Sequence, residues 1–98
     1  MAANPDPTDL TEVTEILNAL PIGSFTGTAA HRRYVVTKTL FSDGRAVKLV
    51  AEELGAADYI SLNFYHLQSG PRLFPCEMPR AKVVAFLHAL RVTGQDDA

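Results

Sequence analysis

The sequence predicts an α+β protein: an antiparallel meander sheet of four to five strands, with an N-terminal and a C-terminal helix packed on one face. Apolar residues recur at intervals of three and four near both ends of the chain, as in amphipathic helices. Between them, turn signals built on Gly, Asp and Pro recur about every dozen residues. Residues 59–67 alternate between apolar and polar side chains, which is the period of a half-buried strand.

The first helix is expected over residues 9–20. Thr8 or Asp9 can cap its N-terminus, and Pro21 cannot continue it. Residues 1–7 read as a flexible leader. The apolar stripe that would face the core consists of Leu10, Val13, Leu17 and Leu20.

The strands are expected between the turn signals. In the strand at 59–67, Phe64 and its alternate neighbours would face the core, whereas Tyr65 would point away from it. The expected strands are 24–29, 34–41, 59–67 and 72–76.

Residues 45–54 are ambiguous. Their composition and the following Gly55 suit a helix with a glycine cap, and Val47, Val50 and Leu54 fit helical spacing. Tight turn signals on both sides favour a hairpin strand. We expect a strand, which would be the fifth of the meander.

The second helix is expected to begin at Pro79, because proline suits the first helical position. Val83, Leu87 and Leu90 form its apolar face, and Gly94 follows its end. Residues 95–98 read as a flexible tail. A chain of 98 residues fits one domain, so residues 1–98 are expected to form a single domain.

Composition and charge indicate a globular protein of the cytoplasm. The sequence has no recognisable signal peptide or membrane-spanning stretch, and its single cysteine cannot form an intramolecular disulfide. Residues 24–92 carry nine basic and five acidic side chains, a net charge of +4, and the other six acids lie toward the ends. A mildly basic body suits an anionic partner, although a solvated surface of mixed charge is the simpler interpretation.

No motif predicts catalysis, a metal or a cofactor. The three histidines and Cys76 do not form ligand-spaced pairs, and no phosphate-binding loop is present. Cys76 precedes the second helix, whose N-terminus could activate a thiol, but Glu77 beside it opposes this. We therefore expect an inert thiol and a protein that is not an enzyme, with no small-molecule substrate identified.

The most suggestive feature is the sheet face opposite the helices. Tyrosine and arginine are favoured at interface centres, so this face predicts association with another protein or with a second copy. The alternative is weak binding of single-stranded nucleic acid, since aromatic rings beside cations stack bases. An ordinary solvated sheet face is the third interpretation. The residues assigned to the face are Tyr59, Asn63, Tyr65, Arg32, Arg33, Lys38, Lys48 and Arg72.

The order of the expected elements also bears on the alternative. A strand meander followed by a C-terminal helix resembles the layout of one class of single-stranded DNA-binding domains. The resemblance lies in element order alone and implies no role for any residue.

Overall fold

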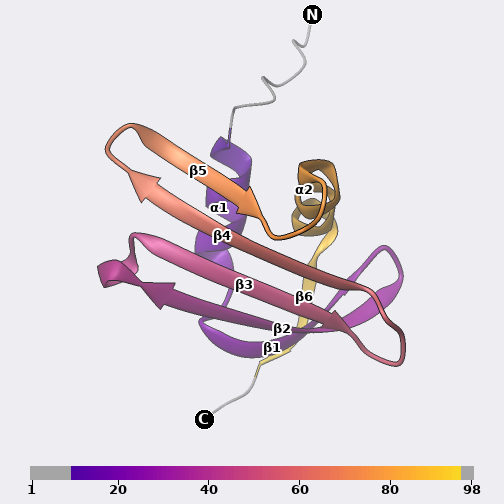
Figure 1. Cartoon of the computed structure of the whole chain (residues 1–98). Coiled ribbons are helices and arrows are strands. Elements are labelled where there is room, and N and C mark those ends of the chain that lie inside the picture. Colours follow the sequence, from indigo (N-terminus) through magenta and orange to yellow (C-terminus); the bar gives the residue numbers. More distant parts are fainter. Residues whose placement is uncertain (1–9, 96–98) are drawn as a thin grey trace, which may run out of the picture.

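A computed structural model describes residues 10–95, which form one antiparallel six-stranded sheet and two helices (Figure 1). The strands lie in the order β5-β4-β3-β2-β1-β6. The predicted leader, Thr8 and Asp9 as caps, and the last three residues of the predicted tail lie outside the described residues. In chain order the elements are α1 (Thr11–Ala19), β1 (Gly23–Ala29), β2 (Arg32–Phe41), the 3-10 turn η1 (Ser42–Gly44), β3 (Ala46–Glu53), β4 (Tyr59–Leu67), β5 (Gly70–Pro75), α2 (Arg80–Ala89) and β6 (Arg91–Gln95).

The predicted α+β class and antiparallel sheet are confirmed, and β1 to β5 follow one another as a meander. The ambiguous segment is the strand β3, paired with β2 on one side and β4 on the other. Both of its neighbours are hydrogen-bonded to it along most of their length. Sheet pairing therefore overrides the helix-forming composition of this segment.

The sheet has one strand more than the four to five expected. After α2 the chain turns at once into β6, which pairs antiparallel with β1 and forms an edge of the sheet. Gly94 lies within this strand and does not cap the helix, and Gln95 is its last residue. The five residues of β6 were too few to show an alternating pattern.

Gly27 explains how β6 fits against β1. A Cβ atom at this position would lie 2.8 Å from Leu90 Cδ1 and 2.9 Å from the carbonyl oxygen of Arg91. The strand pairing also shifts register between Thr26 and Gly27. A side chain at position 27 would therefore push away the start of β6, so the glycine is required by close approach.

The helix starts differ slightly from those expected. Leu10 occupies the N-cap position of α1 and provides no side-chain hydrogen bond, although the Thr14 hydroxyl donates to its carbonyl oxygen at 2.8 Å. Pro79 is the N-cap residue of α2, and Arg80 is its first helical residue. Each shift is within the one or two residues by which helix ends vary.

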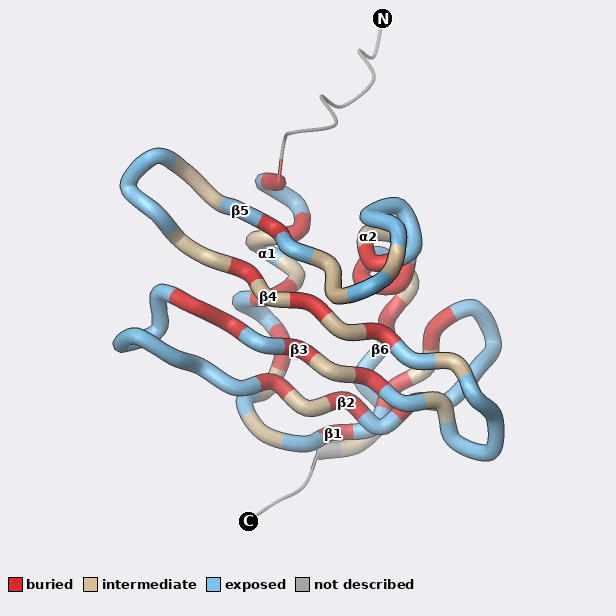
Figure 2. The backbone as a smooth tube through the Cα atoms, in the orientation of Figure 1, coloured by how far each residue is buried: buried red, intermediate tan, exposed pale blue. Residues whose placement is uncertain are grey.

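Both helices lie on the same side of the sheet, behind it in the view of Figure 1. Burial alternates along the strands as a result (Figure 2), most regularly in β4. Ile60, Leu62 and Phe64 face the helices and are buried, and their neighbours in β4 are more exposed. The core is therefore a single layer between one sheet face and two helices.

Truncating Phe64 should cost much more stability than truncating Tyr65. Phe64 is fully buried, so Phe64→Ala should lower the free energy of unfolding by about 3 to 5 kcal/mol. Tyr65 lies on the other face and is only half-buried, so Tyr65→Ala should cost much less in the monomer. Urea denaturation at low protein concentration measures both values. Equal large losses would contradict the assignment of faces.

Candidate interaction face

Within residues 10–95, one face of the sheet carries no helix, and we call its side chains the open face. Residues directly opposite each other in adjacent strands share a face, so the strand register assigns its members. Across the centre of the sheet, Ser61 lies opposite Val50, and Val50 lies opposite Thr37. The open face comprises Ser24, Thr26, Thr28, Arg33, Val35, Thr37, Thr39, Phe41, Ala46, Lys48, Val50, Glu52, Tyr59, Ser61, Asn63, Tyr65, Leu67, Arg72 and Phe74.

The structure brings six of the eight predicted face residues together on the open face. Tyr59, Asn63 and Tyr65 alternate along β4. Lys48 lies opposite Asn63, and Arg72 lies opposite Tyr65. The sixth is Arg33, near the start of β2.

The assignment of Lys38 to this face is wrong. Lys38 lies on the helix side of β2, with Tyr34 and Val36, and is only 5% exposed. Its ammonium donates hydrogen bonds to the backbone carbonyls of Leu17 and Leu20 at the end of α1. Helix ends leave such carbonyls without partners, and a cation there complements the helix dipole. Burial lowers the pKa of this amine.

Arg32 also points away from the open face, contrary to the expectation. It follows the alternation of Tyr34, and its guanidinium lies 3.7 Å from Glu53 and 3.9 Å from Asp58. Asp58 additionally accepts hydrogen bonds from the Tyr34 hydroxyl at 3.0 Å and the Lys82 ammonium at 2.7 Å. We call Arg32, Tyr34, Glu53, Asp58 and Lys82 the Asp58 cluster.

The Asp58 cluster joins β2, α2 and the turn before β4. The hydrogen bond from Lys82 is the largest influence on Asp58 and, with that from Tyr34, lowers the pKa of its carboxyl. Burial, followed by the hydrogen bond to Asp58, raises the pKa of Tyr34. Tyr34 and Asp58 are 24 residues apart in the sequence, and so are Asp58 and Lys82. No local sequence pattern therefore revealed this cluster.

One end of the open face is aromatic. The rings of Tyr65 and Phe74 meet edge to face, with centroids 5.6 Å apart. Phe74 is 52% exposed, and Phe41 in β2 is 48% exposed. Lys48 and Arg72 flank these rings in neighbouring strands. This corner therefore combines apolar area with positive charge.

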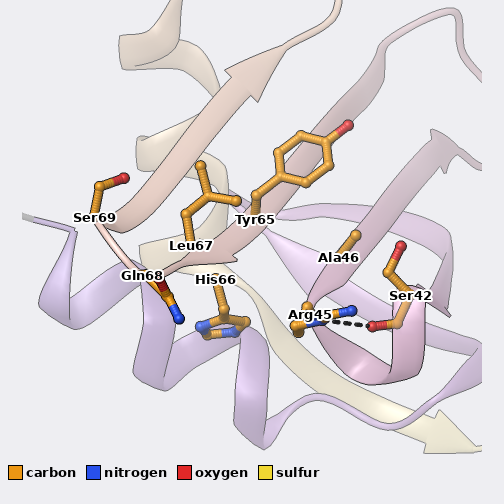
Figure 3. Close-up of a pocket in the computed structure, with 8 residues that line it drawn as sticks. All are labelled: Ser42, Arg45, Ala46, Tyr65, His66, Leu67, Gln68 and Ser69. Atoms are coloured by element: carbon orange, nitrogen blue, oxygen red, sulfur yellow. Dashed lines mark hydrogen bonds between the residues drawn. The ribbon is translucent and has the colours of Figure 1, made fainter.

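A hollow of about 570 Å³ lies beside the aromatic end (Figure 3). Tyr65 and His66 line it from opposite sides of β4. Arg45 also lines it, and its Nε donates to the carbonyl oxygen of Ser42 at 3.2 Å. The His66 ring packs against Phe64 with centroids 4.9 Å apart. The side chains of Arg45 and His66 thus both have structural contacts within the chain.

Cys76, which we expect to be an inert thiol, is half-buried directly after β5. Its thiol lies 3.8 Å from the Asn63 amide nitrogen, and no histidine among residues 10–95 is hydrogen-bonded to it. The imidazole of His88 lies 3.6 Å from the Glu12 carboxylate. No group of three or more metal-ligating side chains occurs in the described part of the chain.

Comparison with known proteins leaves the face to be interpreted from its own geometry. No protein-family model, curated protein or solved structure matches the chain. Within residues 10–95, neither helix has the length and apolar character needed to cross a membrane.

The Asp58 cluster should make stability depend on acid pH. A carboxyl with a folded pKa below its usual 3.8 stabilises the fold above that pH, and this stability is lost as pH falls through the folded pKa. Asp58→Asn should therefore cost about 1 kcal/mol at neutral pH, and the difference from wild type should shrink below pH 3.8. Urea denaturation across this range measures it.

The exposed Asp43 in η1 provides the control. Asp43→Asn should leave the acid dependence of stability unchanged. The wild type could instead keep a constant advantage in the free energy of unfolding over Asp58→Asn down to strong acid. That result would contradict the electrostatic role of Asp58.

Proposed function

We propose that this protein is a non-enzymatic interaction module that self-associates through the open face. The observation that carries the proposal is the exposure of large apolar side chains on a sheet face that no helix of the described residues covers. Phe74 is 52% exposed, Phe41 48% and Tyr59 43%, and Val35 adds an aliphatic side chain. Covering these side chains would remove apolar area from water, which favours association.

The composition of the open face fits an interface better than a solvated surface. Solvated faces of antiparallel sheets are usually polar. Interfaces are enriched in aromatic residues and arginine, and their rims are polar. Here Phe41, Tyr65 and Phe74 occur with Arg33 and Arg72, and threonines occupy much of the rest.

The extent of the face is close to that of a standard interface. The five strands that supply the open face lie about 4.8 Å apart and are about eight residues long, so they present roughly 600 Å² before side-chain relief is counted. Specific interfaces bury about 800 Å² per partner. The open face therefore supplies most of the required area without help from the helices.

Removing an aromatic ring from the open face should weaken self-association. Phe41→Ser and Phe74→Ser should each raise the dimer Kd by about tenfold or more, because truncated aromatic anchors are costly at interfaces. Leu40→Ser is the matched control, since Leu40 is 39% exposed in the same strand but points to the other side. Sedimentation equilibrium at several protein concentrations measures the Kd.

The control variant should retain the wild-type Kd. A wild-type protein that remains monomeric at all concentrations would refute the proposed function. Equal weakening by Leu40→Ser and Phe41→Ser would place the interface elsewhere.

Single-stranded nucleic acid is the second candidate partner. The Tyr65–Phe74 ring pair beside Lys48 and Arg72 favours it, because such rings stack bases while cations neutralise phosphates. Two observations count against it: Lys38 is buried, and Arg32 is engaged in the Asp58 cluster. Three of the five predicted basic residues remain available on the face.

A labelled 20-mer of mixed sequence should bind no tighter than about micromolar at physiological salt, the range of non-specific electrostatic binding. Fluorescence anisotropy measures this affinity. Nanomolar binding that weakens with salt and is lost in the Tyr59→Ala/Tyr65→Ala double variant would make nucleic acid the principal partner.

A further inference from the structure

The strand register restricts how two open faces can meet. Two copies that pack face to face are related by a two-fold axis lying in the plane of the interface, so each contact occurs twice. If the axis runs across the strands, it divides each strand into two halves. A residue in one half then faces a residue of the same strand of the second copy that lies equally far from the axis in the other half. The charges along β3 distinguish this arrangement from others.

The centre of the open face is a row of small side chains across four strands. Ser24 lies opposite Thr37, Thr37 opposite Val50, and Val50 opposite Ser61. The Ser24 and Thr37 hydroxyls are 3.2 Å apart and hydrogen-bonded. Small side chains here allow two sheets to approach to about 10 Å, the usual spacing of stacked sheets. We call these four residues the central row.

Lys48 and Glu52 lie two residues to either side of Val50 on the open face, and both are exposed. They are about 13 Å apart along the strand, too far to pair with each other. Within residues 10–95, neither takes part in an ion pair. Each is therefore an exposed charge available to a partner.

We propose that the second copy binds with its two-fold axis along the central row, so that Lys48 of each copy meets Glu52 of the other. This inference rests on the proposed self-association and specifies its geometry. The same axis brings Arg33 opposite Phe41 of the second copy, because both lie four residues from Thr37 in β2. A guanidinium over an aromatic ring is itself attractive.

An axis along β3 would give an unfavourable interface. Lys48 would then face Lys48, and Glu52 would face Glu52, of the second copy. Like charges brought together at an interface are strongly unfavourable. Charge complementarity thus favours the axis across the strands over one along β3, with Arg72 left at the rim.

Charge reversal tests this geometry in the full chain. Lys48→Glu and Glu52→Lys each create two like-charged contacts in the dimer, so each should raise the Kd by about tenfold or more. The double variant Lys48→Glu/Glu52→Lys restores opposite charges and should return the Kd to within about threefold of wild type. Sedimentation equilibrium at constant salt measures all four proteins.

A matched control carries the same charge change as Glu52→Lys on the other side of the sheet. Glu15→Lys alters an exposed residue of α1 and should leave the Kd unchanged. Circular dichroism melts at a concentration below the Kd check that every variant folds.

Each other outcome contradicts a distinct part of the account. A wild-type dimer whose Kd is unaffected by either single reversal, or not restored in the double variant, would overturn the axis while leaving self-association intact. A wild-type protein that stays monomeric would overturn both the axis and the proposed function.

Discussion

The pleat of a β-strand sends successive side chains to opposite faces, and in this protein both helices lie on only one of them. That arrangement confines the core to one layer, in which Phe64, Leu62 and Ile60 of β4 pack beneath α1 and α2. It also leaves every alternate residue of the strands facing outward. The composition of the open face therefore follows from the same alternation that builds the core.

Two polar groups tie the covering layer to the sheet. The buried Lys38 binds the carbonyls at the end of α1, and the Asp58 cluster links β2 to α2 through Lys82. A buried amine is costly unless hydrogen-bonded, and Lys38 satisfies this condition through Leu17 and Leu20. Lys38 and Arg32, which belongs to the Asp58 cluster, are cations that would otherwise add to the basic surface. Their placement consequently leaves three of the five predicted cations on the open face, beside its aromatic side chains.

The regular parts of the fold were predictable because their patterns are local. Residues 59–67 alternate clearly enough to assign Phe64 and Tyr65 to opposite faces. In β2 both faces carry apolar or β-branched residues, so alternation alone did not reveal that Lys38 points inward. The strand β6 is short and depends on the close approach at Gly27, a contact between distant residues. The Asp58 cluster likewise joins residues that only the folded chain brings together.

The central claim is that a second copy covers the open face. Mixing isotope-labelled with unlabelled protein allows nuclear Overhauser effects between the two copies to be measured separately from those within one copy. The account predicts effects between copies at the methyl groups of Val35, Thr37 and Val50, which lie on the open face. It predicts none at Val36 or Leu49, which are fully buried under the helices. The absence of effects between copies at millimolar concentration, or their restriction to the helices or the edge strands β5 and β6, would contradict it.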